Sequence, residues 1–229
     1  NVKVIFDYRG AGAEEYINKL GYNFVTEISD INVKNKYLHL VEEQVFFIKN
    51  ADAVFCVSEQ LKAYALSLLS TSNQYEDKLY VIPGAADNTQ FYVDDSVRLA
   101  LRERYQLQNK IVIVYSGKLN LFWHKKEQIF EMMSALMKID NRFVFLCITP
   151  EIELAKQLSS TFGLIEQNII IKFVEYANIP SFLNMADFGI VLRDNKTTNR
   201  VASPTKIPEY LLCGLPVIIS KYIGDYSGF

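Results

Sequence analysis

Cysteine and histidine are scarce in this chain of 229 residues, which has three cysteines and two histidines. Cys56, Cys147 and Cys213 all lie in apolar segments, and their separations do not match those of metal-ligand pairs. An odd number of widely spaced cysteines indicates buried free thiols in a reducing compartment, rather than disulfides or zinc. We therefore expect no metal site.

The chain also lacks an excess of charge and a long apolar run. Its 24 basic and 26 acidic residues give a net charge of −2, so charge provides no argument for binding nucleic acid or an anionic membrane. The longest apolar runs fall short of the roughly 18–20 residues that a membrane-spanning helix needs. Half of the residues are apolar, which is enough for a sizeable core.

Neither end of the sequence looks like a domain terminus. The chain begins at Asn1 directly before an apolar run and ends at Phe229 shortly after another. No signal peptide is visible. We expect sequence to be missing at both ends, so that some functional groups would lie outside it.

Apolar, β-rich runs alternate with amphipathic patterns along the chain. Predicted strands cover Val2–Tyr8, Ala53–Val57, Leu79–Ile82, Lys110–Ser116, Phe143–Thr149, Ile169–Val174, Phe188–Leu192 and Val217–Ser220. Predicted helices cover Lys36–Asn50, Glu59–Leu69, Ser96–Tyr105, Lys125–Ile139, Ile152–Phe162, Pro180–Ala186 and Pro204–Cys213. This alternation predicts an α/β protein with parallel sheets covered by helices.

The segment Pro83–Tyr105 interrupts this alternation, because it begins with a polar, turn-rich stretch and continues into a charged helix. We place a domain boundary near Phe91. Residues 91–229 then hold five predicted strands, enough for a nearly complete Rossmann-like unit that would lack only its final helices. Residues 1–90 hold three predicted strands, which fits the rear half of a second Rossmann-like unit.

The most informative segment is SPTKIPEYLLCGLPVIIS, which covers Ser203 to Ser220. It predicts a polar loop, a short helix that ends at Gly214, and a buried strand. A helix start with Lys206 would suit a phosphate, and Glu209 could accept hydrogen bonds from sugar hydroxyls. The alternative is an ordinary helix entry and exit without a ligand.

Three further loops follow predicted strands of the same unit: Gly117–Asn120, Glu175–Asn178 and the stretch that begins at Arg193. Ligands of open parallel sheets bind at the carboxyl ends of the strands, so these loops should gather with the segment around Lys206. Their convergence favours a nucleotide as the ligand.

These motifs, in this order, resemble those of GT-B-fold glycosyltransferases of the large retaining class, called family four. In the first unit the similar pieces are FDYRG at residues 6–10, Glu43, Ala51–Asp52, Val57–Ser58 and VIPGAADNTQF at residues 81–91. In the second unit they are VYSGKL, ADFGIVL and PEYLLCGLPVI. The resemblance covers nearly the whole chain.

The resemblance implies a GT-B-like protein with two Rossmann-like units, the first only partly present. It implies transfer of a sugar from a UDP- or GDP-sugar, held by residues 91–229, to a glycan or lipid-linked acceptor, held mostly by the other domain. The anomeric configuration would be retained without a metal or other cofactor. Bacterial surface-polysaccharide synthesis is the implied context. The implied location is the cytoplasm, with peripheral membrane contact where the acceptor is lipid-linked.

The resemblance also assigns roles to residues. Gly117 and Lys118 match the loop that faces the donor diphosphate, and Glu209 matches the glutamate that holds the ribose. Ser203, Pro204, Thr205 and Lys206 match the loop around the distal phosphate and sugar. Arg9 matches a first-domain residue near the reaction centre, so Arg9 and Lys118 are the candidate catalytic residues. Tyr176 is a candidate to pack near the base, with a loop-anchoring role as its alternative.

The sequence departs from the family pattern at three positions. Val201 replaces a glutamate that is frequent eight residues before Glu209, which puts contacts to the transferred sugar in doubt. Trp123 stands where a lysine is frequent, so we assign that role to Lys125. Arg9 replaces a frequent histidine and, because arginine stays protonated, it would act as an electrostatic clamp or simply pair with Glu14 or Glu15.

A dinucleotide fingerprint begins at Gly10 and Gly12, but Glu15 replaces its third glycine, and the carboxylates at positions 14 and 15 would repel a pyrophosphate. Two other functions remain open. One is a sugar-nucleotide epimerase of the same architecture, and the other is a non-catalytic module that binds nucleotide sugars or a partner.

Overall fold

The computed structural model describes residues 2–71 and 74–228, which form two compact units. Unit 1 contains residues 1–84, 194–204 and 221–229, and unit 2 contains residues 85–193 and 205–220. Each unit is an α/β structure built on a parallel sheet, so the predicted fold class is confirmed.

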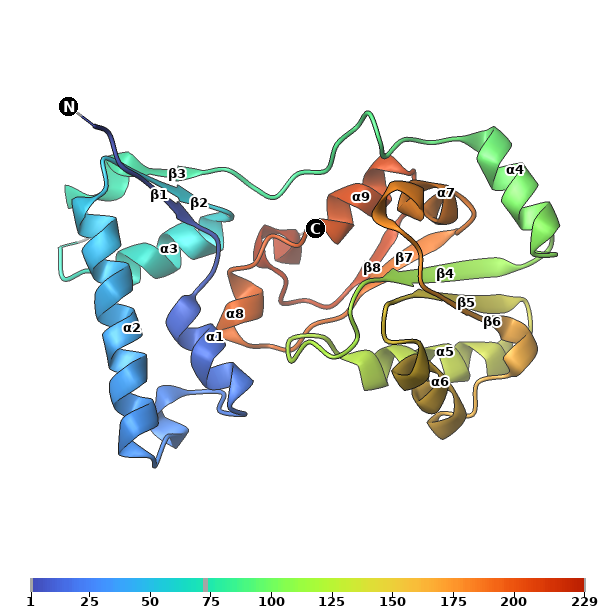
Figure 1. The fold of residues 1–229 in the computed structure, drawn as a ribbon, viewed down its shortest axis with the longest axis horizontal. Coiled ribbons are helices and arrows are strands. Elements are labelled where there is room, and N and C mark those ends of the chain that lie inside the picture. The colour runs from blue at the N-terminus through green and yellow to red at the C-terminus, as the bar shows by residue number, and fades with distance from the viewer. Residues whose placement is uncertain (1, 72–73, 229) are drawn as a thin grey trace. The chain divides into compact units, whose positions relative to one another are not determined.

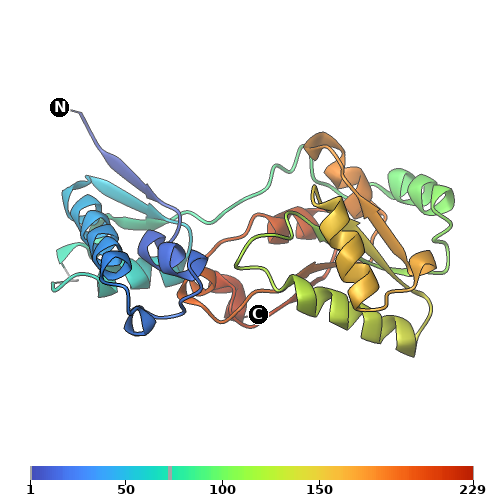
Figure 2. The ribbon, with the colours of Figure 1, turned by 60° about the horizontal axis from the view of Figure 1, so that its bottom comes forward.

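Unit 1 is built on three parallel strands in the order β1-β2-β3, namely β1 (Ile5–Tyr8), β2 (Ala53–Cys56) and β3 (Leu79–Val81). Two helices, α1 (Gly12–Lys19) and α2 (Ile31–Asn50), connect β1 to β2 and pack against each other (Figures 1 and 2). The next connection holds α3 (Glu59–Ser67), whose apolar face carries the buried Leu61 and Ala65.

Two later segments of the chain, residues 194–204 and 221–229, return to unit 1. The Ser58 hydroxyl at the start of α3 donates to the Val201 carbonyl at 2.7 Å, and the Thr198 hydroxyl of α8 (Thr197–Arg200) donates to Asn18 at 2.8 Å. The Asp225 carboxylate accepts from the first two amides of α3, Glu59 N–H and Gln60 N–H. These bonds explain why the structure divides the chain differently from the predicted 1–90 and 91–229.

Unit 2 is built on five parallel strands in the order β6-β5-β4-β7-β8. They are β4 (Ile111–Ser116), β5 (Phe143–Ile148), β6 (Ile169–Lys172), β7 (Phe188–Val191) and β8 (Val217–Ile219). The chain runs from β4 outward to β6, then crosses back to β7 on the other side of β4. The strand order therefore reverses between β4 and β7, and such a switch point is where open parallel sheets bind ligands.

Helices cover both faces of this sheet (Figure 1). One side carries α5 (Lys126–Ile139) and α6 (Ile152–Thr161), and the other carries α7 (Ile179–Asn184) and α9 (Lys206–Leu212). On α5 the residues Ile129, Met133 and Met137 are buried against the sheet, as their helical spacing predicts. Met133 and Met137 therefore belong to the core of unit 2.

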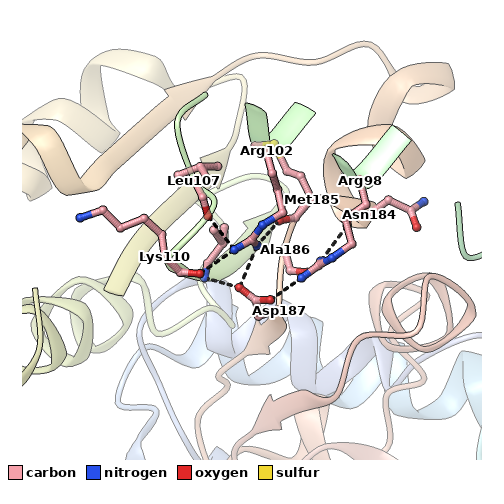
Figure 3. A network of polar contacts seen from close by, with 9 residues as sticks. Arg98, Arg102, Leu107, Lys110, Asn184, Met185, Ala186 and Asp187 are labelled. Atoms are coloured by element: carbon pink, nitrogen blue, oxygen red, sulfur yellow. Dashed lines mark hydrogen bonds and ion pairs between the residues drawn. The ribbon is translucent and has the colours of Figure 1, made fainter. Parts of the chain in front are cut away.

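A charged network holds the edge of the sheet at which β4 and β7 begin, the amino edge (Figure 3). Arg98 and Arg102, one turn apart on α4 (Asp95–Arg104), both pair with Asp187, at 2.6 and 3.0 Å. The same carboxylate accepts the Val112 N–H of β4 at 2.7 Å, and Arg102 donates to the Leu107 carbonyl. Asp187 therefore fastens α4 to the strand ends at which β4 and β7 begin.

All eight predicted strands are present, but β1 starts at Ile5 rather than Val2. The predicted helix 36–50 begins at Ile31, where Asp30 caps it, and the predicted helix 204–213 begins at Lys206. The predicted ranges contain neither α1 nor α8. Both are short and carry polar residues or glycine, so their apolar pattern is weak.

Candidate functional site

The candidate site lies in unit 2 at the carboxyl edge of the sheet, where Gly117 follows β4 and Arg193 follows β7. Tyr210 of α9 fixes this edge, because its fully buried hydroxyl accepts the Ser116 N–H at 2.9 Å. Its ring lies against Gly189 of β7 so closely that a Cβ there would overlap it. The glycine in ADFGIVL and the tyrosine in PEYLLCG are thus one packing unit.

Lys206 lies one helical turn before Tyr210, so the anchored tyrosine places this lysine over the end of β4. A Cβ on Gly117 would lie 2.5 Å from both Cε and Nζ of Lys206. Gly117 also has a φ of +143°, which side chains rarely adopt. Only glycine therefore lets the lysine ammonium lie against the β4 loop.

Glu209 lies beside Lys206 and is 8% exposed. Burial raises the pKa of Glu209, while Lys206 and a hydrogen bond with Tyr176 oppose that rise. Burial also lowers the pKa of Lys206, with the cation of Arg193 adding to the effect and Glu209 opposing it. The structure thus brings together four of the predicted residues: Gly117, Tyr176, Lys206 and Glu209.

The loop after β4 is fixed by side chains from β4, from the segment after β5 and from the loop itself. Glu151 accepts the Leu119 N–H at 3.0 Å and the Thr149 hydroxyl at 2.8 Å. The Lys118 carbonyl lies 2.6 Å from the Tyr115 hydroxyl and 2.9 Å from His124 Nδ1. The Tyr115 hydroxyl also lies 2.6 Å from His124 Nδ1, so these three groups form one hydrogen-bonded cluster that holds the loop.

His124 is neutral near pH 7, because burial, and then the nearby Arg193 cation, lower its pKa to about 4. The backbone around it is tied to β7, since the Lys125 N–H donates to the Leu192 carbonyl at 3.2 Å. Lys125 itself lies just before α5. The side chain of Lys118 is exposed and makes no ion pair with any described residue.

A pocket of about 90 Å³ opens at the ends of β4, β5 and β6. It is lined by Ser116, Gly117, Ile148, Thr149, Pro150, Phe173, Val174 and Ile179. Phe173 is 57% exposed there, which is high for a phenylalanine. Tyr176, also exposed, lies edge-on to the buried Phe91, with ring centroids 5.9 Å apart.

Arg9, Ser203 and Pro204 belong to unit 1, unlike the residues described above. Arg9 is exposed and its Nε lies 2.6 Å from the Asp7 carboxylate. It does not form the ion pair with Glu14 or Glu15 that the sequence offered as an alternative to a role as a clamp. The Ser203 hydroxyl accepts the Gly84 N–H at 2.9 Å, while Thr205 is exposed in unit 2. The predicted loop 203–206 is therefore divided between the units.

Sequence reasoning did not single out Arg193 as a site residue, although it nominated the loop that begins there. Arg193 is buried enough that its pKa is lowered to about 10. A lone arginine after an apolar strand carries no spacing signal, so only the strand order could have drawn attention to it. Within the described residues, no group of three or more His, Cys, Asp or Glu side chains is placed to hold a metal ion.

Comparison with known families and curated proteins gives no match to any family model and no curated relative. Solved structures do match. HepE of Anabaena in complex with UDP aligns with a TM-score of 0.68 at 16% identity, over 98% of this chain and 55% of that one. WaaG, a glycosyltransferase involved in lipopolysaccharide biosynthesis, aligns with a TM-score of 0.66 at 12% identity, over 100% and 62%. Sucrose-phosphate synthase of Thermosynechococcus elongatus gives 0.62 at 16% identity, over 98% and 51%.

This chain has the fold of the GT-B glycosyltransferases. The resemblance inferred from the motifs is confirmed at the level of fold. The chain spans between half and two thirds of the length of each of these proteins. No helix within residues 2–71 and 74–228 is both long and apolar enough to cross a membrane.

Proposed function

We propose that this chain is part of a glycosyltransferase that moves a sugar from a nucleoside diphosphate sugar, UDP- or GDP-linked, to a glycan or lipid-linked acceptor. One observation carries the proposal: the half-buried ammonium of Lys206 lies against the bare backbone of Gly117, with Glu209 beside it, at the switch point of the sheet. A cation and an acceptor of hydroxyl hydrogen bonds, side by side, suit a phosphate next to a ribose.

Each group at this edge has a role in holding the donor. Lys206 binds the diphosphate, and the Glu209 carboxylate accepts hydrogen bonds from the ribose hydroxyls. The exposed ring of Phe173, which lines the pocket, offers an aromatic surface on which the base would stack. Tyr176, which hydrogen-bonds Glu209, orients this carboxylate before the ribose arrives.

The transfer step needs the leaving nucleoside diphosphate to be stabilised as the anomeric bond breaks. Lys206, Lys118 and Lys125 would provide fixed positive charge around it, without a metal ion. Arg9 remains the candidate clamp from unit 1, where its guanidinium is exposed. Retention of configuration and these roles of Lys118, Lys125 and Arg9 are part of the proposal.

The solved structures support the donor class and the pathway. HepE has been captured with UDP-glucose, and it matches over 82% of this chain with a TM-score of 0.63. WaaG is involved in lipopolysaccharide biosynthesis, which is a bacterial surface polysaccharide pathway. On this basis we propose the same kind of pathway here, with the protein acting at the cytoplasmic face of a membrane when its acceptor is lipid-linked.

A panel of nucleotides tests the donor site. UDP or GDP at about 100 times its Kd should stabilise the chain by roughly 2.7 kcal/mol, because it binds only the folded state. Lys206→Met should weaken that binding by about tenfold or more, through loss of a charge-assisted contact worth about 1.5–3 kcal/mol. Urea denaturation with and without nucleotide gives the stabilisation, and isothermal titration calorimetry gives the affinities. The exposed Lys138→Met at the end of α5 is the matched control. If neither UDP nor GDP binds the wild-type chain, the proposal is wrong.

A second measurement separates transfer from the alternatives. A sugar nucleotide with a labelled sugar is incubated with glycan and lipid-linked acceptors and the longest available form of the protein. A transferase moves the label to an acceptor, and an epimerase leaves it on a nucleotide with inverted stereochemistry. A binding module returns the donor unchanged.

A further inference from the structure

Arg193 occupies the second side of the switch point. It follows β7 by two residues, as Gly117 follows β4 by one, and these two strands are the neighbours between which the strand order reverses. Ligands of open parallel sheets bind in the crevice at that point. Position alone therefore places Arg193 opposite the loop against which Lys206 lies.

The backbone of Arg193 is held on both sides. Its N–H donates to the Ser220 hydroxyl at 2.8 Å, and that hydroxyl donates to the Arg193 carbonyl at 2.9 Å. On the other side Arg193 forms an antiparallel bridge with His124. A side chain on so fixed a backbone loses little entropy when it binds a ligand.

One donor of the Arg193 guanidinium is not used by the fold. Its Nε is buried and has no hydrogen-bond partner among the described residues. No described carboxylate pairs with it, whereas Arg98 and Arg102 of the same unit share Asp187. A buried N–H without a partner is costly, so a group that the fold leaves in this state requires an explanation.

The surroundings of Arg193 increase the energetic cost of leaving its buried N–H without a partner. The nearby Lys206 is a second cation, and the adjacent His124 is uncharged, so neither provides a counter-charge. Glu209 acts on Lys206, and Glu151 acts on His124, but neither carboxylate forms an ion pair with Arg193 within the part of the chain that the structure describes. A bound anion would supply the partner that Arg193 lacks.

We propose that Arg193 binds a phosphate oxygen of the donor through its guanidinium, so that Arg193 and Lys206 contact the diphosphate from the two sides of the switch point. This inference rests on the proposed function and adds a residue to it. The planar guanidinium donates in a fixed direction, which suits orientation of a phosphate better than a lysine does.

The test compares ligands that differ only in phosphate. Affinities of wild-type protein, Arg193→Gln and Arg193→Lys are measured by calorimetry for UDP, GDP and the matching nucleosides. Arg193→Gln should weaken binding of the nucleoside diphosphate at least tenfold and change binding of its nucleoside less than twofold. Arg193→Lys should recover part of the loss, because it restores the charge but not the planar arrangement of donors. Inorganic pyrophosphate should compete with the nucleotide less well in Arg193→Gln than in wild type.

Arg142→Gln is the matched control, since this exposed arginine precedes β5 at the opposite edge of the sheet and should leave all affinities unchanged. The inference is overturned if Arg193→Gln binds the diphosphate within twofold of wild type. It is also overturned if diphosphate and nucleoside affinities fall together, which would indicate a structural role. If the wild-type chain binds no nucleoside diphosphate, the proposed function itself is wrong. This result can be distinguished from the two outcomes that overturn the inference on Arg193.

Discussion

Single residues at the carboxyl edge of unit 2 depend on one another through contact rather than through sequence spacing. Tyr210 fills the space above Gly189, and Lys206 fills the space above Gly117. Each glycine is required because a side chain from α9 occupies the position of its missing Cβ. The two glycines and the two α9 side chains therefore act as a pair of matched contacts that set the position of the helix.

Gly117→Ala should damage the site more than the fold. The new methyl group would crowd the Lys206 ammonium and would also force an unfavourable φ, which costs on the order of 1 kcal/mol or more. We expect the affinity for the nucleoside diphosphate to fall at least tenfold, as measured by calorimetry.

Gly163→Ala is a control that separates strain from crowding. Gly163 also has a positive φ, of +64°, but its Cβ would have no neighbour within 4 Å. We expect a similar loss of stability in urea denaturation and no change in nucleotide affinity. Equal affinities for the two variants would show that the contact between Gly117 and Lys206 has no role in binding.

At the scale of elements, the strands of both units follow directly from the sequence because their apolar runs are continuous. The helices are less well predicted where tertiary contacts decide them. The short helix α8 exists because Thr198 bonds to Asn18, far away in the sequence. For the same reason Arg98 and Arg102 look like ordinary surface arginines in a charged helix, and only the structure shows that both meet Asp187 (Figure 3).

Asp187→Asn should loosen α4 from the sheet and destabilise unit 2 by roughly 2–3 kcal/mol, because two partly buried arginines lose their counter-charge. Burial would raise the pKa of Asp187, but the Val112 N–H and the two arginines hold it below the usual 3.8. Because the pKa of Asp187 is lower in the folded protein than in the unfolded chain, its ionised form stabilises the fold fully above about pH 5. This stabilisation is lost as the pH falls below the pKa of the unfolded chain and through that of the folded protein.

Urea denaturation at several pH values checks this prediction. The gap in unfolding free energy between wild type and Asp187→Asn should be largest near pH 7 and should narrow below pH 4. Asp140→Asn, which removes a partly exposed carboxylate paired with the exposed Arg142, should have a much smaller effect. A gap that stays constant between pH 7 and pH 3 would contradict a role for the ionised carboxylate.

At the scale of the whole molecule, the chain passes between the two units four times, at residues 84–85, 193–194, 204–205 and 220–221. The sequence predicts one boundary because only the first passage is marked by a long polar, turn-rich segment. The later passages fall within stretches whose local patterns resemble ordinary loops. Two of them flank Arg193 and Lys206, so the residues proposed to hold the diphosphate lie where the chain leaves and re-enters unit 2.

Because residues 194–204 return to unit 1, the hydroxyl of Ser58 at the start of α3 can stabilise a segment more than 100 residues away in the sequence. Ser58 accepts the Leu61 N–H at 2.9 Å as the cap of α3 and donates to the Val201 carbonyl at 2.7 Å, so Ser58→Ala removes both bonds. We expect a loss of about 1–3 kcal/mol in unfolding free energy.

Hydrogen exchange provides the decisive readout, because a lost cap alone would affect only α3. In Ser58→Ala, amides of residues 197–202 should exchange faster together with those at the start of α3. Ser67→Ala is the matched control, since this exposed serine on the same helix bonds only within it, to the Tyr64 carbonyl. If exchange in 197–202 is the same in both variants, Val201 is held in unit 1 by its buried side chain and not by Ser58.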